Sequence, residues 1–247
     1  MSELHTEVMG VGERVILVHG SLATGREEWW AQQPLADEGF QLVIVDRRGY
    51  GDSPPIDGED FLVDADDIAE LLGDGAHLVA HSYGGLGAML AAARLPGSVR
   101  SLTLLEPPAF GLTADEAAAT LVSELRAMWD LDLPDDVWLA AFLRAVGTDP
   151  EVIPPEARRG LEAMVPLLRD GRRVWEFEVP AELAGAEFPK LVVSGGHHDG
   201  FESICDQLAQ RIGASRATVE GAGHEIQFTG QPLNEKLLEF WRGTRDG

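Results

Sequence analysis

The sequence predicts an α/β fold in which a mostly parallel sheet is covered by helices on both faces. Short, uninterrupted apolar runs alternate with helical segments from about residue 14 to residue 106. Apolar runs without alternation are typical of parallel strands that are buried on both faces. One such run ends in a serine between small residues and leads into an alanine-rich helix, as a nucleophile elbow does. In a sheet of this kind, ligands bind beyond the carboxyl ends of the strands.

Each expected element follows from its local pattern. Residues 5–12 suggest one short strand or a remnant hairpin, and the next strands are apolar runs that end in loops rich in Gly, Pro and Asp. These buried strands are expected at 14–20, 41–46, 76–81, 98–106, 188–195 and 216–220. The helices between them show apolar residues at helical spacing, and glycines follow several of their ends. They are expected at 29–38, 63–72, 86–95, 203–212 and 231–241.

Residues 110–183 interrupt the alternation. They contain no strong strand pattern, and helices are expected at 114–128, 135–146 and 155–168. We therefore predict a core made of residues 1–109 and 184–247 and a helical cap made of residues 110–183. The apolar faces of the cap helices should pack on one another and partly over the site.

Composition excludes several classes of function. The 247 residues include 19 basic and 42 acidic side chains, and the resulting net charge of −23 would repel nucleic acid and anionic membranes. The one cysteine, Cys205, cannot form an internal disulfide, and no Cys/His spacing suggests a metal site. The N-terminus has no signal-peptide pattern, and no apolar run reaches the roughly 18 residues of a membrane helix. We expect a cytoplasmic protein with a small-molecule substrate, whose oligomeric state the sequence leaves open.

The candidate chemistry centres on Ser82. Ala80 and Gly84 flank it and supply the small side chains that a strained strand-to-helix turn requires. A serine hydroxyl needs a base, and the base needs a carboxylate to orient it. His224 follows the last expected strand, and Asp199 follows the strand before it. Ser, Asp and His occur in the chain order of an α/β-hydrolase triad, each at the same edge of the sheet.

The chain resembles the α/β-hydrolase superfamily, in particular capped serine hydrolases such as esterases, lactonases, perhydrolases and carbon–carbon bond hydrolases. The motifs that carry this resemblance lie at residues 19–20, 46–53, 81–85, 196–199 and 223–224. The resemblance implies an eight-stranded sheet, with its first strands abbreviated here, and a cap between the sixth and seventh strands. It also implies an oxyanion hole formed by the backbone N–H groups of Ser21 and Tyr83, with Leu22 as the alternative to Ser21.

The identity of the triad acid has two candidates. Asp199 stands in the Gly-x-x-Asp setting of the commoner family pattern, and we favour it. Glu106 ends the strand that follows the elbow helix, and some lactonase relatives take their acid from that strand. If Glu106 is not the acid, it should line the substrate pocket. The expected pocket residues are Leu22, Glu106, Trp129 and Trp138.

These residues predict a cofactor-free serine hydrolase. Ser82 would attack a carboxylic ester, lactone or thioester and form an acyl-enzyme, with His224 as general base. Two alternatives stay open, namely perhydrolysis or carbon–carbon cleavage by the same triad, and a ligand-binding protein without turnover. A metal site at His81, His197, His198 and Asp199 is disfavoured, because neighbouring residues in a loop rarely converge on one ion.

Overall fold

The sheet is seven-stranded and almost entirely parallel in the computed structural model, which describes residues 4–113 and 115–243. The strand order is β1-β3-β2-β4-β5-β6-β7, and only β1 runs antiparallel to its neighbour β3. The strands are β1 (Thr6–Met9), β2 (Glu13–Val18), β3 (Phe40–Val45), β4 (Ala76–His81), β5 (Val99–Leu105), β6 (Lys190–Ser194) and β7 (Ser215–Thr218). The predicted fold class is confirmed. The resemblance implied eight strands, whereas the described residues form seven. A single short antiparallel strand, β1, forms one edge of the sheet.

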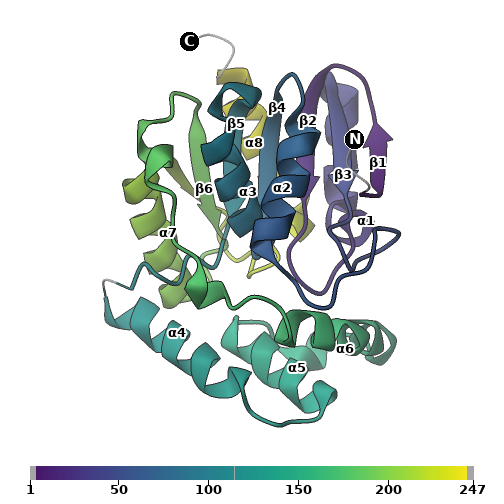
Figure 1. The fold of residues 1–247 in the computed structure, drawn as a ribbon, viewed down its shortest axis with the longest axis vertical. Coiled ribbons are helices and arrows are strands. Elements are labelled where there is room, and N and C mark those ends of the chain that lie inside the picture. The colour runs from purple at the N-terminus through teal and green to yellow at the C-terminus, as the bar shows by residue number, and fades with distance from the viewer. Residues whose placement is uncertain (1–3, 114, 244–247) are drawn as a thin grey trace.

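Helices cover both faces of the sheet (Figure 1). One face packs against α2, α3 and α7, and the other packs against α8 and a 3₁₀ segment, Trp30–Glu38. The α-helices of the core are α1 (Gly25–Glu28), α2 (Phe61–Leu72), α3 (Gly84–Arg94), α7 (Asp199–Ile212) and α8 (Gln231–Gly243). The α-helix expected at 29–38 is instead mostly 3₁₀, and Pro34 within it lacks the N–H that an α-helical turn requires.

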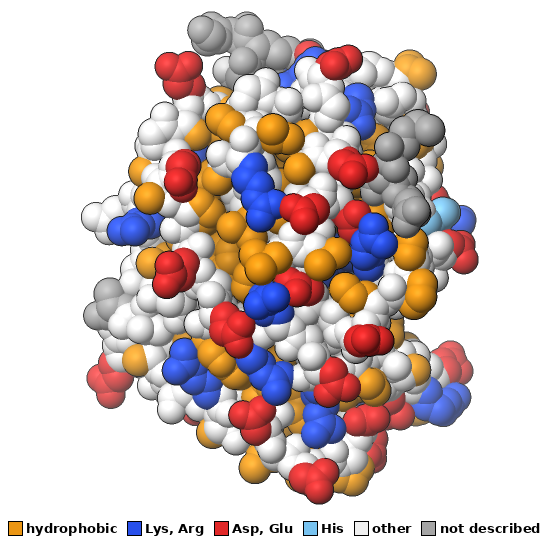
Figure 2. Space-filling model, in the orientation of Figure 1, with side chains coloured by type: hydrophobic (Ala, Val, Ile, Leu, Met, Phe, Trp, Pro, Cys, Tyr) orange, Lys and Arg blue, Asp and Glu red, His pale blue; other side chains and the backbone are white. Residues whose placement is uncertain are grey.

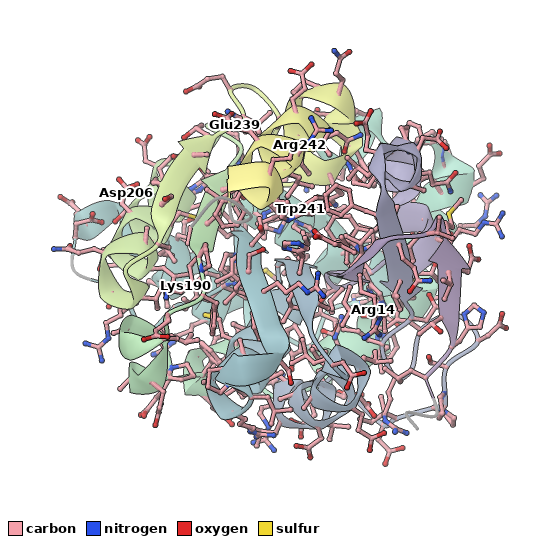
Figure 3. All side chains as sticks on the ribbon, turned by 90° about the horizontal axis from the view of Figure 1, so that it is seen from above. Arg14, Lys190, Asp206, Glu239, Trp241 and Arg242 are labelled. Atoms are coloured by element: carbon pink, nitrogen blue, oxygen red, sulfur yellow. The ribbon has the colours of Figure 1, made fainter. Side chains whose placement is uncertain are left out.

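The strands contribute side chains to two hydrophobic cores, one on each face of the sheet. In β2, Ile16 and Val18 point into the cluster beneath α2 and α3, while Val15 and Leu17 point into the cluster beneath α8. Alternate residues of a strand face opposite sides, so an unbroken apolar run fits a sheet covered on both faces. Trp241 extends from α8 over the sheet, fully buried, with its ring 4.7 Å from that of Phe40 (Figure 3).

The segment between β5 and β6 is helical, as expected, and we call residues 110–183 the helical insertion. Its helices are α4 (Glu116–Trp129), α5 (Asp135–Ala145) and α6 (Pro155–Arg169), and they lie across one end of the sheet (Figure 1). Ala114, the expected first residue of α4, lies outside the described residues, and Asp115 caps the helix by accepting the Ala118 N–H. The insertion separates the fifth and sixth strands, not the sixth and seventh, because one N-terminal strand fewer is present.

The surface carries charges of both signs. On the face shown in Figure 2, basic side chains lie among the acidic ones, and apolar atoms are exposed between them. Among the helices that the structure describes, none has both the length and the apolar character needed to cross a membrane.

Candidate functional site

Ser82 occupies a sharp turn between β4 and α3. Its backbone φ is +46°, a left-handed conformation that costs a non-glycine residue energy and is typical of functional sites. The neighbouring backbone leaves no room for larger side chains, since a Cβ on Gly84 would lie 2.3 Å from the carbonyl oxygen of His19. The Ser82 N–H donates to the Leu105 carbonyl at 2.9 Å. The strained turn expected around Ser82 is therefore present.

His224 lies within hydrogen-bond distance of the serine. Its Nε2 is 3.1 Å from Ser82 Oγ, and the residue is 6% exposed. The Phe201 ring packs 4.9 Å from the imidazole ring and limits the positions that it can take. The structure thus brings together the two residues that were expected to be nucleophile and base.

Glu106 is the carboxylate that contacts this histidine. Its Oε2 lies 2.7 Å from His224 Nδ1, and its Oε1 accepts the Gly195 N–H at 2.7 Å. Its backbone φ at the end of β5 is +40°, a left-handed conformation. Burial would raise the pKa of the Glu106 carboxyl, but interactions with His197 and His224 outweigh burial and lower the pKa to about 2. Glu106 is therefore an anion at neutral pH.

Asp199 does not contact His224, which corrects the sequence-based preference for Asp199. It is the first residue of α7 and is exposed, because His198 takes the N-cap position and its Nδ1 accepts the Gly200 N–H at 3.0 Å. Starting the helix at this point directs Asp199 toward solvent. The position next to His224 is instead taken by Glu106.

Leu22 shares the left-handed backbone conformation of Ser82 and Glu106. Across the described residues, the non-glycine residues with positive φ are Leu22, Ser82 and Glu106, at +65°, +46° and +40°. All three were candidate site residues from the sequence. Backbone strain gathered at one place is typical of a site whose geometry the surrounding fold enforces.

The loop after β2 presents Ser21 beside Ser82, and both residues line the same cavities. The Leu22 N–H donates to the Tyr50 hydroxyl at 3.2 Å, so that N–H is already engaged. Tyr83 is the N-cap residue of α3, where a backbone N–H has no partner inside the helix. The engaged Leu22 N–H is therefore a less suitable oxyanion donor than an N–H without such a partner would be. The Ser21 hydroxyl donates to Glu59, at 2.8 Å from Oε2.

A buried network of ion pairs holds the loop after β2 in place. Arg47 donates to the backbone carbonyls of His19 and Gly20 and pairs with Glu59 and Asp64, and all three charged residues are buried. Burial acts to lower the pKa of the Arg47 guanidinium, but the carboxylates raise it well above its ordinary value. Arg47 is therefore a permanent cation that holds two carbonyl groups of the loop in place.

A second buried ion pair joins the loop to the elbow. His81 Nδ1 lies 3.1 Å from Glu28 Oε1, and His81 Nε2 lies 3.1 Å from the His224 carbonyl oxygen. Burial acts to lower the pKa of His81, yet the charge and hydrogen bond of Glu28 raise it to about 9. Both ring nitrogens face acceptors, so the imidazolium satisfies both contacts. Glu28 also accepts the Gly20 N–H at 3.0 Å.

One group of potential metal ligands occurs among the described residues, formed by Glu28, His81 and Glu225. Metal binding would need a lone pair on His81, whereas both of its nitrogens lie opposite hydrogen-bond acceptors. The closeness of these side chains is better explained by the ion pair between His81 and Glu28. His197 and His198 lie apart from it, with His197 Nδ1 3.5 Å from Glu106 Oε1 and His198 capping α7.

Two cavities meet at Ser82 and His224. The larger has a volume of about 370 Å³ and is lined by Leu22 among other apolar side chains, while the smaller has a volume of about 30 Å³ and is lined by Trp129. The other two predicted pocket residues line neither cavity. Glu106 is buried against His224, and Trp138 is fully buried in the packing between α5 and Trp129, 5.3 Å from that ring.

Sequence reasoning missed Glu28 and Glu59, and it gave His197 no role beside Glu106. In the sequence, Glu28 and Glu59 stand out only as acidic residues before apolar ones. Glu28 precedes Trp29, and Glu59 stands shortly before Phe61. Many exposed helix starts in this acidic chain have the same appearance, because acidic residues are favoured there. Glu59 pairs with Arg47, 12 positions away, and Glu28 pairs with His81, 53 positions away, so neither partner can be recognised from the neighbouring residues.

Comparison with known proteins gives a consistent assignment. The model of the alpha/beta hydrolase family matches residues 15–235. Curated relatives include the non-heme chloroperoxidase CPO-A1 of Kitasatospora aureofaciens, 39% identical over 34% of this chain, and a pimeloyl-[acyl-carrier protein] methyl ester esterase of Shewanella woodyi, 31% identical over 55% of this chain. The matched segments span only 32% and 52% of those two relatives.

Among solved structures, an alpha/beta hydrolase from Sphaerobacter thermophilus superposes with a TM-score of 0.74 at 25% identity, covering 96% of each chain. The fold, the strained serine turn and the family match agree over nearly the whole length of the sequence. This chain belongs to the alpha/beta hydrolase family.

Proposed function

We propose that this protein is a serine hydrolase that cleaves neutral carboxylic esters, lactones or thioesters through an acyl-enzyme. The observation that carries this proposal is the continuous chain of contacts from Ser82 Oγ through His224 to Glu106, at 3.1 Å and 2.7 Å. A base within hydrogen-bond reach of a nucleophile, oriented by a third group, is the arrangement that activates a hydroxyl. The esterase activity named for the Shewanella woodyi relative adds support.

In the proposed reaction, Glu106 accepts a hydrogen bond from Nδ1–H of His224 and leaves Nε2 unprotonated. Ser82 Oγ attacks the carbonyl carbon while its proton passes to Nε2. The backbone N–H groups of Ser21 and Tyr83 donate to the oxygen as it becomes negative, each contributing on the order of 3 kcal/mol. The anionic Glu106 stabilises the imidazolium that forms.

The tetrahedral intermediate then collapses. His224 donates its Nε2 proton to the leaving oxygen, and the alcohol departs. A water molecule next gives a proton to Nε2 as its oxygen attacks the acyl-enzyme, and the second intermediate releases the carboxylic acid and restores Ser82. The helical insertion would act as the cap that covers the reacting groups, since its side chains line both cavities next to Ser82.

A second candidate is perhydrolysis, in which hydrogen peroxide replaces water in attack on the same acyl-enzyme. The sequence similarity to the chloroperoxidase CPO-A1 favours this candidate. It needs no residue beyond the proposed triad. Activity with acetate and peroxide, measured by halogenation of monochlorodimedone, would distinguish it from simple hydrolysis.

The test of the proposal uses Ser82→Ala and a fluorophosphonate probe. The wild-type protein should hydrolyse p-nitrophenyl acetate and gain one probe adduct, located on Ser82 by peptide mass spectrometry. Ser82→Ala should lose both, with an unchanged circular dichroism spectrum and Tm. Hydrolysis by the folded Ser82→Ala variant would reject the mechanism, and a folded wild-type protein without adduct or hydrolysis would favour a binding role.

A further inference from the structure

Two cavities of very different size meet at the reacting groups. Ser21, Ser82 and His224 line both, but the volumes are about 30 Å³ and about 370 Å³. The larger cavity therefore has about twelve times the volume of the smaller one, and the smaller has room only for a small group.

The smaller cavity is lined by buried and half-buried residues, most of them apolar. Trp129, Leu125 and Phe201 line it and are at most 3% exposed. Tyr83, whose N–H is the proposed oxyanion donor, lines this cavity and not the larger one. A substituent in this cavity thus lies next to the proposed oxyanion hole, among side chains that are themselves largely buried.

The larger cavity reaches the surface on the side of the His224 loop. Glu225 and Phe228 line it, and Phe228 is 47% exposed at its rim. Most of its remaining lining is apolar, from residues such as Leu143, Ile153 and Leu161. A neutral apolar group fits this lining, while the Glu225 carboxylate would repel an anionic one.

Phe142 and Val146 are the apolar residues that line both cavities, and we take them as the wall between the two. They belong to α5 and its C-cap. The Phe142 ring stacks on Trp138 at 5.3 Å with planes 8° apart, and Trp138 is fully buried. The wall is therefore supported by the packing of the helical insertion.

The order of bond breaking decides which part of an ester enters which cavity. The alcohol must leave before water can reach the acyl-enzyme, so it needs a route to solvent. The acyl group stays bonded to Ser82 and needs none. A leaving group in the smaller cavity would lie among buried side chains, whereas one in the larger cavity lies on the side of the exposed Phe228, and His224 can protonate it there.

We infer that the substrates are esters of a very short acyl group, such as acetyl or propionyl, with a larger, neutral and apolar alcohol, and that Phe142 sets the acyl limit. This inference rests on the proposed function. It assigns the smaller cavity to the acyl group and the larger one to the alcohol.

Two ester series test the inference. With p-nitrophenyl esters, kcat/KM should fall by at least about tenfold from acetate to octanoate, since surplus methylenes have no cavity to enter. With alkyl acetates, kcat/KM should rise as the alcohol grows from methyl to hexyl. A preference for octanoate over acetate would overturn the inference while leaving the proposed function intact.

Variants of the wall provide the second arm. Phe142→Ala should join the cavities and raise the ratio of kcat/KM for octanoate to that for acetate by about tenfold or more. If Phe142→Ala does not fold, Val146→Ala removes a smaller part of the wall. Leu161→Ala enlarges only the larger cavity and should leave that ratio unchanged. An unchanged ratio in folded Phe142→Ala and Val146→Ala would reject the wall. Fluorophosphonate labelling of Ser82 in every variant separates these outcomes from failure of the proposed function, which would overturn both.

Discussion

Glu106 accepts a hydrogen bond of 2.7 Å from Nδ1 of His224, although the two residues are 118 positions apart in the sequence. The bond fixes the tautomer of the imidazole, so that Nε2 faces Ser82 Oγ with a lone pair. Glu106 is itself held by the Gly195 N–H, which donates to its other oxygen. The carboxylate has little freedom to move away from the histidine.

The oxyanion donor at Ser21 should be its backbone and not its hydroxyl. The hydroxyl donates to Glu59, so Ser21→Ala should lower kcat by less than about tenfold. Ser21→Pro removes the N–H and should lower kcat by about 10²- to 10³-fold. Steady-state kinetics with p-nitrophenyl acetate measures both, and Tm verifies folding. Equal losses in the two variants would argue against the backbone donor.

The Glu28–His81 pair should make stability depend on pH. The pKa of His81 is raised from 6.5 to about 9 in the folded protein, so its contribution is complete below pH 6.5 and is lost as pH rises through about 9. The Tm of the wild-type protein should therefore fall between pH 7 and pH 10. His81→Gln should start from a lower Tm and fall less over that range. Parallel curves for the two proteins would exclude this origin of the pH dependence.

Arg47 should be far more important for stability than an exposed arginine. Arg47→Met leaves Glu59 and Asp64 buried without their cation and should lower the free energy of unfolding by about 3–5 kcal/mol. The control is Arg94→Met, whose exposed pair with Asp66 should contribute less than about 1 kcal/mol. Urea denaturation measures both. Similar losses would mean that the buried network does not stabilise the fold.

The sequence was sufficient to predict the elements that depend on local pattern. The apolar strand before Ser82 and the small residues around it predict the elbow, and a loop after the last strand predicts the place of His224. Family membership and the fold class follow from the same motifs. These features are local, because turn sterics and strand burial act over a few residues.

The acid could not be chosen from the sequence, because Asp199 and Glu106 both follow strands that end at the same edge of the sheet. The choice depends on the start of α7, where His198 caps the helix and leaves Asp199 exposed. Trp138 was misplaced for a related reason. Helical spacing indicates an apolar face, but it does not say whether that face meets a cavity or another helix.

The comparison of kcat between Glu106→Gln and Asp199→Asn tests the proposed triad most directly. Both changes replace a carboxylate by an amide of equal size, and Tm verifies that both variants fold. The proposed triad predicts that Glu106→Gln lowers kcat for p-nitrophenyl acetate by about a thousandfold or more, because the imidazole loses its anionic partner. Asp199→Asn should leave kcat within about twofold of wild type. A large loss in Asp199→Asn with full activity in Glu106→Gln would contradict the triad of Ser82, His224 and Glu106.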